Sequence, residues 1–255
     1  MSNINFKIEN GVGVITLNRP EKFNSFVRQM ALDLQVRLDE CEKNTEVRAI
    51  YLTGEGKAFC AGQDLAEAID PNKTDLEKIV EEHYNPIIER LRNIEKPIVC
   101  AVNGIAAGAG ANLALACDIV FAAKSASFIQ AFSKIGLIPD SGGTYYLPRL
   151  IGFQKATALM FLGDKVMAED AEKMGMIYKS VADENLHTEA LKIAQTLAKM
   201  PTKGIGLTKR LLNQTYNNTL TEQLTLENKI QTIAGNTYDY NEGVNAFLEK
   251  RKPNF

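Results

Sequence analysis

The stretch from Pro97 to Gly143 decides the fold of this chain. It begins PIVCAVNG at residues 97–104, continues IAAGAGANLALA at 105–116 and closes with FIQAFSKIGLIPDSGG at 128–143. The first segment is an apolar run rich in β-branched residues, which is typical of a strand buried on both faces. Asn103-Gly104 is a turn signal. Residues 106–111 carry no side chain larger than a methyl group, and the helix formers after them indicate that a helix begins there.

Backbone N–H groups at such a helix start are open to a ligand and lie at the positive end of the helix dipole. They can stabilise an oxygen that gains negative charge in a transition state, by about 3–4 kcal/mol per donor. Close packing of a helix on a sheet also requires small residues, so the stretch alone leaves both interpretations open. Asp140, which precedes a double glycine, is likewise either an acid or base, or a former of a turn or helix cap.

Composition limits the classes of function. The 255 residues can bury a sizeable core in one large or two small domains. With 29 basic and 31 acidic residues, the chain has no positive excess that would attract nucleic acid or an anionic membrane. No apolar run approaches the roughly 20 residues that span a bilayer, so we expect a soluble, cytoplasmic protein. Four widely spaced cysteines and two histidines predict buried free thiols and no metal site.

Periodicity predicts strands in the first two thirds of the chain and helices in the last third. A hairpin turning at Asn10-Gly11 is expected over 6–18, followed by a helix that Asn24-Ser25 caps and whose apolar face includes Val36. Further strands are predicted at 47–53, 97–102, 118–123, 127–128 and 177–181. Helices are predicted at 75–94, with Pro86 as a kink or restart, and at 145–151, 154–162, 168–174, 186–199, 203–234 and 241–250. Residues 54–65 are expected to form a loop, and 70–74 a polar break.

Several segments together resemble the crotonase family, which is the enoyl-CoA hydratase/isomerase superfamily. They are ITLNRP at 15–20 with Asn24, KAFCAGQDL at 57–65, residues 96–118, 136–143 and 168–175, and EGVNAFLEKRKP at 242–253. The resemblance covers almost the whole chain in family order. It implies an α/β fold in which a spiral of ββα units, residues 1–200, holds an acyl-CoA site. A helical region, residues 201–255, would then serve assembly as a homotrimer or a dimer of trimers.

The family pattern also implies how a thioester would be bound. Its carbonyl oxygen would lie between the backbone N–H groups of Gln63 and Ala109, with Gly110 as the alternative second donor. No separate cofactor is implied, because coenzyme A is part of the substrate. Further contacts to the substrate would come from Lys22, Phe23, Ala61, Gly62, Asp64, Leu65, Gly110, Asn112, Phe132, Phe247 and Lys250. The last two belong to a neighbouring subunit in some family members, and both lysines can equally be solvated surface residues.

The side chains that move protons depart from those of the hydratases. Hydratases of the family carry glutamates where this chain has Asn112 and Phe132, and the missing pair disfavours addition of water. Asp140 stands where dienoyl-CoA isomerases and 4-chlorobenzoyl-CoA dehalogenases have a catalytic aspartate, but the histidine of the dehalogenases is replaced by Asn85, with His83 on another face. The similarity is greatest to isomerases of phenylacetate catabolism, which implies conversion of an epoxide to an oxepin-CoA and movement of a β,γ double bond to the α,β position.

One carboxylate suits an isomerisation, because the group that removes a proton can return it. We therefore expect Asp140 to act as acid and base, with a pKa raised by Leu137, Ile138 and Phe132. Asn112 would bind substrate or water, or be a buried amide, and Phe132 would shape the acyl pocket or belong to the core. The alternatives are an enoyl-CoA hydratase that uses Asp140 alone, and a non-catalytic or RNA-binding protein on the same scaffold.

Overall fold

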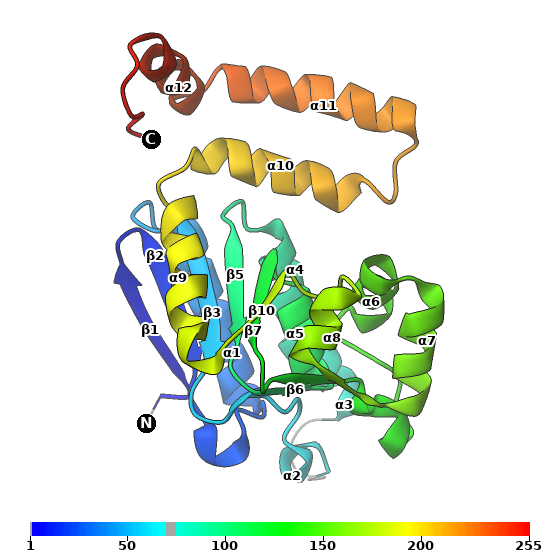
Figure 1. The fold of residues 1–255 in the computed structure, drawn as a ribbon. Helices are drawn as coiled ribbons and strands as arrows, with labels where there is room; N and C mark the ends of the chain where they lie inside the picture. Colours follow the sequence, from blue (N-terminus) through cyan, green and yellow to red (C-terminus); the bar gives the residue numbers. More distant parts are fainter. Residues whose placement is uncertain (1, 70–74) are drawn as a thin grey trace.

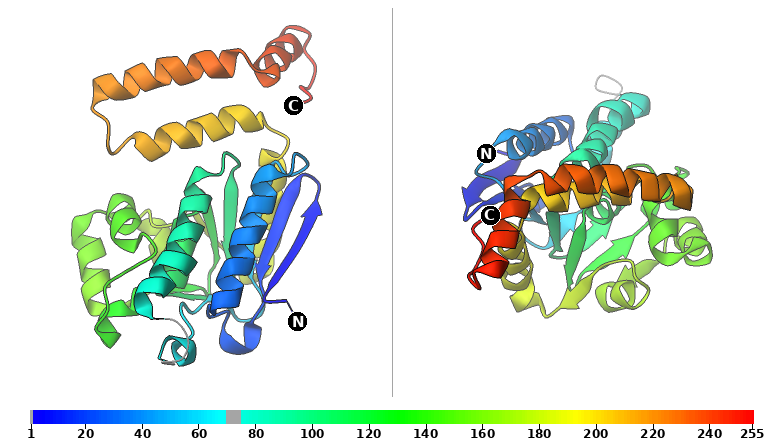
Figure 2. Two further views of the ribbon diagram at one scale, coloured as in Figure 1. Left: turned by 180° about the vertical axis from the view of Figure 1, so that it is seen from behind. Right: turned by 90° about the horizontal axis from the view of Figure 1, so that it is seen from above.

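The computed structural model describes residues 2–69 and 75–255, so the polar break predicted at 70–74 lies outside the described residues. The body of the protein contains a 6-stranded sheet of order β1-β2-β3-β5-β7-β10 and a 4-stranded sheet of order β4-β6-β8-β9. Helices α1 and α4 pack side by side on one face of the larger sheet, and α9 covers the other face (Figures 1 and 2). The core lies between these layers.

Successive strands alternate between the two sheets. The larger sheet contains β3 (Ala49–Gly54), β5 (Ile98–Val102) and β7 (Ile119–Ala123), and each is followed at once by a strand of the smaller sheet, namely β4 (Ala58–Cys60), β6 (Ile105–Ala107) and β8 (Ser127–Ile129). The three strands of each set pair in parallel. Each turn of the chain therefore adds one strand to each sheet, which is the predicted spiral of ββα units. The fully buried β5 also confirms the strand predicted after Pro97.

The first and last strands complete the sheets. β1 (Ile4–Glu9) and β2 (Val12–Leu17) form the predicted hairpin, and Asn10 and Gly11 at its turn have φ of 51° and 77°, as a type I′ turn requires. β9 (Lys165–Met167) and β10 (Lys179–Val181) are at the far edges. The sequence pattern missed β6 and β9 and placed β4 in a loop. Strands of three residues are too short for a periodic signal, and their formation depends on pairing with distant segments.

The expected start of the first long helix is wrong. Helix α1 spans Arg28–Lys43 and no side chain caps it. Asn24 instead adopts a left-handed conformation, accepts a hydrogen bond from Arg19 N–H (2.8 Å), and donates to the carbonyls of Glu55 (2.9 Å) and Ala58 (2.8 Å). The Asn24 amide thus links the segment before α1 to residues 55–58, and it is not available to cap a helix. Val36, assigned to the apolar face, is also misplaced because 56% of it is exposed.

The helix predicted over 75–94 contains three parts. It comprises α3 (Leu76–Lys78), a π-helical segment (Ile79–Tyr84, η2) and α4 (Asn85–Asn93), with Pro86 in the first turn of α4 as a restart. The remaining helices of the body are η1 (Pro20–Lys22), α2 (Leu65–Ala68), α5 (Ala109–Leu115), η3 (Ala131–Ile135), α6 (Gly143–Ile151), α7 (Phe153–Leu162), α8 (Ala168–Lys173), η4 (Asp183–Asn185) and α9 (Leu186–Leu197).

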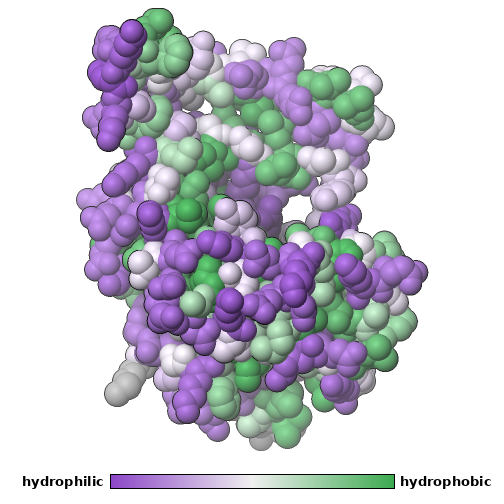
Figure 3. All heavy atoms as spheres, viewed as in Figure 1, coloured by the Kyte–Doolittle hydropathy of each residue, from purple (hydrophilic) through white to green (hydrophobic). Residues whose placement is uncertain are grey.

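The last part of the chain is helical, as predicted, but residues 203–234 do not form one continuous helix, because the chain turns at 215–219. It forms α10 (Thr202–Gln214), α11 (Leu220–Gly235) and α12 (Tyr238–Leu248), with α10 and α11 lying across one end of the body (Figures 1 and 2). Apolar side chains are exposed along these helices (Figure 3), among them Leu212, Tyr216, Leu220, Leu224, Val244, Phe247 and Leu248. A division between 1–200 and 201–255 stays a prediction.

Three expectations from composition concern the cysteines, membrane spans and metal sites. All four cysteines are free and buried, as predicted. The helices formed by residues 2–69 and 75–255 include none that combines the length and apolarity needed to cross a membrane. Within the same residues, no three His, Cys, Asp or Glu side chains are grouped in a way that could hold a metal ion.

Candidate active site

The loop that carries Gln63 is fixed by backbone hydrogen bonds to the segment before α1. Phe26 N–H donates to Gly62 C=O (2.7 Å), and Asp64 N–H donates to Phe26 C=O (2.9 Å), so that Phe26 and Gln63 form an isolated parallel bridge. In such a bridge the donors and acceptors on the loop belong to the residues on either side of Gln63. The N–H of Gln63 therefore points away from Phe26.

Ala109 lies next to this loop. It is the first residue of α5, so its N–H has no partner within the helix. A Cβ atom built on Gly62 would lie 3.5 Å from Ala109 N and 2.9 Å from Ala107 O, and Gly62 has a φ of +89°. Only glycine fits this close approach and adopts this positive φ without strain. The structure thus places Gly62, the residue directly before Gln63, against the backbone N of Ala109.

Gly110 lets α5 approach β4. A Cβ atom on Gly110 would lie 2.3 Å from Cys60 O and 2.7 Å from Cys60 Sγ, so any side chain would push the helix away from the strand. The second helical residue also lacks a partner for its N–H within the helix. Gly110 therefore remains available as the alternative second donor, while its lack of a side chain has a packing reason as well.

Asn112 is a buried amide whose hydrogen bonds are satisfied within the protein. Its Nδ2 donates to Asp140 C=O (2.8 Å), and its Oδ1 accepts from Gln130 Nε2 (2.8 Å). Gly143 N–H donates to the same Asp140 carbonyl (2.8 Å). Of the two interpretations that the sequence left open, the structure supports the buried amide. Asn112 anchors the backbone of Asp140 and ties it to α5.

The carboxyl group of Asp140 is largely enclosed by protein. Ser141 Oγ donates to Asp140 Oδ1 (2.8 Å), and among the described residues no lysine or arginine forms an ion pair with this carboxylate. Burial raises the pKa of Asp140 above its ordinary value of 3.8, against the smaller opposing effect of the hydrogen bonds from Ser141 and from its own backbone. The predicted direction of the pKa shift is thus confirmed.

The predicted cause of that pKa shift is partly wrong. Ile138 is 81% exposed and Leu137 is also exposed, so neither encloses the carboxyl group within this chain. The residues around Pro139 turn outward because Asn112 and Gly143 hold the Asp140 carbonyl against α5 and α6. Phe132 is buried as expected, and its ring lies 3.7 Å from where a Cβ on Gly108 would be, directly before Ala109.

The other expected contacts fall into two groups. Lys22 and Phe23 lie beside the loop of Gln63, because Phe23 C=O accepts the N–H of Ala61 (3.0 Å), and Leu65 is exposed at the start of α2. Phe247 and Lys250 do not join them. They lie in and just after α12, at the end of the molecule opposite α2 (Figure 1), and Phe247 is 83% exposed.

Asp64 has a positioning role in the structure. Its carboxylate pairs with Arg19 Nη2 (3.0 Å) and accepts the N–H of Ala66 (3.1 Å) at the start of α2. Burial alone would raise the pKa of Asp64, but the hydrogen bond and charge of Arg19 and the N–H groups of α2 together lower it. This carboxylate therefore holds the loop of Gln63 in place from one side.

Sequence reasoning missed three residues of the site, namely Arg19, Tyr84 and Gln130. The hydroxyl of Tyr84 donates to Gln63 Oε1 (2.8 Å), although its helical spacing indicated only a core position. Gln130 is a polar residue directly after an apolar strand, a signal that could have identified it. Its Oε1 atom is buried and has no hydrogen-bond partner in the described structure, beside Asn112.

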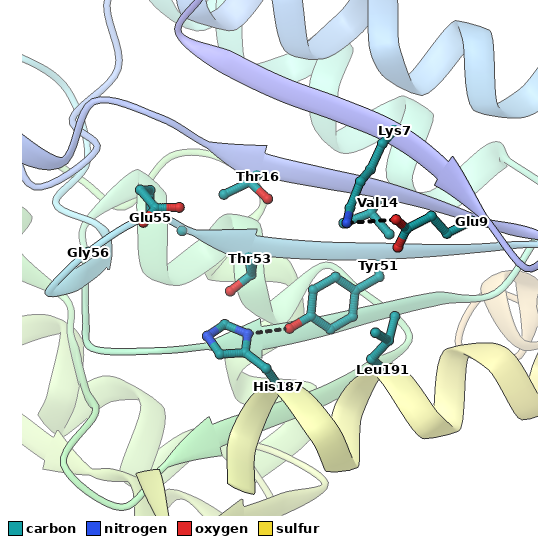
Figure 4. Close-up of a pocket in the computed structure, with 11 residues that line it drawn as sticks. Lys7, Glu9, Val14, Thr16, Tyr51, Thr53, Glu55, Gly56, His187 and Leu191 are labelled. Carbon is teal, nitrogen blue, oxygen red and sulfur yellow. Dashed lines mark hydrogen bonds and ion pairs between the residues drawn. The ribbon is translucent and has the colours of Figure 1, made fainter. Parts of the chain in front are cut away.

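A separate groove of about 440 Å³ lies on the other side of the larger sheet (Figure 4). Side chains of β1, β2 and β3 line it together with His187 and Leu191 of α9, and Tyr51 hydroxyl is 2.7 Å from His187 Nδ1. None of the residues predicted for the active site lines this groove. The groove is therefore separate from the candidate active site.

The fold and the arrangement of Gln63, Ala109 and Asp140 define a protein of the crotonase type. The chain belongs to the enoyl-CoA hydratase/isomerase family, whose model matches residues 7–255. This confirms the family and the fold class that the sequence motifs predicted.

Two curated relatives are similar along nearly their whole length. The 1,2-epoxyphenylacetyl-CoA isomerase of Escherichia coli is 50% identical over 251 residues, which is 97% of this chain and 96% of that protein. A protein of Rhodobacter capsulatus named "Probable enoyl-CoA hydratase" is 42% identical, with 99% and 97% covered. The crystal structure of an enoyl-CoA hydratase from Bacillus anthracis superimposes with a TM-score of 0.91 at 33% identity, covering 99% of this chain and 98% of that one.

Proposed function

We propose that this protein is an acyl-CoA isomerase that moves a proton, and with it a double bond, next to a CoA thioester. The observation that carries the proposal is the enclosed carboxyl group of Asp140, with its raised pKa and without a second carboxylate at the positions of Asn112 and Phe132. Asp140 would remove a proton from one carbon and return it to another. The backbone N–H groups of Gln63 and Ala109 would stabilise the enolate oxygen formed in between.

We further propose the two substrates that the family resemblance implies, namely 1,2-epoxyphenylacetyl-CoA, converted to oxepin-CoA, and 3-enoyl-CoA, converted to 2-enoyl-CoA. The 50% identity to the 1,2-epoxyphenylacetyl-CoA isomerase of Escherichia coli supports the first of them. Assembly as a homotrimer or a dimer of trimers is part of the same proposal, because Phe247 and Lys250 could then reach the site of a neighbouring subunit. The apolar side chains exposed on α10–α12 support such an assembly. A cytoplasmic location also stays a prediction.

Hydration is the second candidate, since other relatives carry the name of enoyl-CoA hydratase. It needs a group that holds the attacking water opposite the base. Asn112 is poorly suited to do this, because its amide is buried and its oxygen and one of its N–H groups are already bonded to Gln130 and to the Asp140 carbonyl. The buried Gln130 Oε1, which has no partner among the described residues, is an atom of this cluster that could hold a water.

Incubation in heavy water separates the two functions. We expect 3-enoyl-CoA to give 2-enoyl-CoA, with any exchanged deuterium confined to the carbons beside the double bond. Epoxyphenylacetyl-CoA should give the ring-expanded thioester. Rapid formation of a 3-hydroxyacyl-CoA from 2-enoyl-CoA, without conversion of either isomerase substrate, would assign the protein as a hydratase instead.

A further inference from the structure

The side chain of Gln63 is held at both ends. The hydroxyl of Tyr84 donates to Gln63 Oε1 (2.8 Å), while Gln63 Nε2 donates to Glu67 Oε2 (3.2 Å). The same Glu67 oxygen accepts the N–H of Arg28 (2.9 Å), the first residue of α1. A backbone donor needs nothing from its own side chain, so the proposed function does not account for these contacts.

Phe26 contacts both Tyr84 and Gln63. Its ring packs edge to face on Tyr84, with centroids 5.9 Å apart and an interplanar angle of 65°. Phe26 also forms the backbone bridge to Gln63. Phe26, Gln63 and Tyr84 therefore form a closed triangle of one backbone bridge, one ring contact and one hydrogen bond. We call it the Phe26–Gln63–Tyr84 triangle.

The backbone at Tyr84 departs from regular helix geometry. Tyr84 is the last residue of the π-helical segment Ile79–Tyr84, which lies between α3 and α4. Such segments are rare and frequently occur at functional sites, because one inserted residue turns the side chains to directions that a continuous α-helix does not provide. Here the insertion leaves the Tyr84 side chain 1% exposed and aimed at Gln63.

Tyr84 remains a hydrogen-bond donor throughout the neutral pH range. Burial raises its pKa well above the ordinary value of 10, and the neighbouring acidic groups of Cys60, Asp140 and Glu67 raise it further. The phenol therefore donates to Gln63 Oε1 across that range.

We propose that Tyr84 is a positioning residue, which acts through the side chain of Gln63 to aim the Gln63 N–H at the thioester oxygen. The inference rests on the proposed function, because it requires that N–H to be an oxyanion donor. Hydrogen bonds weaken steeply as they bend. The oxygen gains its negative charge only as the enolate forms and not in the bound substrate, so misdirection of the donor lowers kcat and leaves KM nearly unchanged.

A double-mutant cycle tests whether the Tyr84 hydroxyl acts through the side chain of Gln63. We expect Tyr84→Phe and Gln63→Met each to lower kcat about 10-fold, a fraction of the 10²–10³-fold lost with a whole donor, and to change KM by less than about 2-fold. The double variant should be no slower than either single variant, because the hydroxyl acts only through Gln63. Additive effects in the double variant would overturn the proposal.

Tyr51→Phe is the matched control. Tyr51 is also a buried tyrosine, 3% exposed, and its hydroxyl contacts His187 in the groove of Figure 4, away from the site. We expect a loss of thermal stability similar to that of Tyr84→Phe with unchanged kcat. If the two variants lower kcat equally per folded molecule, Tyr84 has no special role and the proposal is wrong.

A spectroscopic measurement separates this inference from the proposed function. The ultraviolet absorption of a bound 2,4-dienoyl-CoA shifts to longer wavelength when donors polarise its carbonyl, whether or not a proton moves. We expect a smaller shift in Tyr84→Phe and an unchanged shift in Asp140→Asn. A full shift in Tyr84→Phe overturns the positioning role. A shift in the unsubstituted protein without any isomerisation overturns the proposed function alone.

Discussion

Asp118 and Asp140 are both largely buried carboxylates, but their surroundings differ. Asp118 is paired with two cations, Lys209 Nζ at 2.8 Å and Arg92 Nη1 at 3.0 Å. Asp140 has the hydroxyl of Ser141 as its side-chain partner. A buried charge with full pairing can serve structure, whereas a buried carboxyl group without a cation costs stability and is expected where chemistry needs a titratable group. The difference favours a structural role for Asp118 and agrees with the catalytic role that we propose for Asp140.

The paired site joins the C-terminal helices to the body. Lys209 is a buried residue of α10, and its ammonium group also donates to the carbonyl of Leu91 at the end of α4 (2.7 Å). Burial lowers the pKa of Lys209, and the charge of Asp118 opposes this effect. Arg92 adds hydrogen bonds to Asn213 Oδ1 of 3.1 and 2.6 Å. Helix α10 is therefore attached to the body by charge as well as by apolar contact.

Asp118→Asn is expected to have the largest effect on stability. It leaves Lys209 and Arg92 in a buried position without their anion, which should lower the free energy of unfolding by about 3 kcal/mol. The turnover number per folded molecule should be unchanged, because the network does not reach the site. Urea unfolding together with kcat measures both quantities. A large loss of kcat with normal stability would contradict the division between the two carboxylates.

Asp140→Asn should give the opposite result. We expect turnover to fall by about 100-fold or more, since a general acid and base is lost, while binding of acyl-CoA measured by calorimetry stays nearly the same. The free energy of unfolding should not decrease, because the amide removes a buried charge that has no cation. Turnover near that of the unsubstituted protein would refute the role of Asp140.

The pH dependence sharpens the comparison further. Between its ordinary pKa of 3.8 and its higher folded pKa, Asp140 holds a proton in the folded state that it has released in the unfolded state. Its contribution to stability therefore decreases as pH rises through this window. Activity should rise through the same window, because the ionised carboxylate is the base. The acid limb of the pH profile of kcat/KM should have its midpoint above 3.8.

Asp64 provides the control for this measurement. Its folded pKa is lowered, so its contribution to stability is present above 3.8 and is lost as pH falls through the lower folded value. Acid unfolding is compared between the unsubstituted protein and Asp140→Asn. A difference in the pH dependence of their free energies of unfolding then comes from Asp140, because Asp64 is present in both proteins. If the two proteins unfold with identical pH dependence, the pKa of Asp140 is not raised.

Much of the fold could be predicted because local patterns and the family motifs agree. The buried strand after Pro97, the turn at Asn10-Gly11 and the restart at Pro86 follow from residue types that favour one local structure. The cap assigned to Asn24-Ser25 failed because a loop from a distant part of the chain uses the Asn24 amide. β4, β6 and β9 were missed because three-residue strands depend on their partners.

The candidate site was predictable where the family motif determines the backbone. Gly62, next to Gln63, lies against Ala109, and Asp140 has the expected direction of pKa shift. The environment of Asp140 was not predictable, because the neighbours in sequence, such as Ile138, are not its neighbours in space. Tyr84 was not identified as a site residue because its neighbours in space are also distant in sequence. The direction of its side chain depends on a π-helical insertion, and no residue type in the segment predicts that insertion.

The smallest predicted effect concerns the attachment of α10. Gly204 and Gly206 are two residues apart in this helix, but a Cβ on Gly206 would lie 2.3 Å from Glu95 O, whereas one on Gly204 would meet nothing within 4 Å. Gly204→Ala should therefore raise the free energy of unfolding by about 0.5–1 kcal/mol through helix propensity, with kcat unchanged. Gly206→Ala serves as the control, since it should lower stability by forcing α10 from the body next to Lys209. Equal effects of the two substitutions would mean that α10 does not pack on the body as described, and the structural role of Asp118 would fail with it.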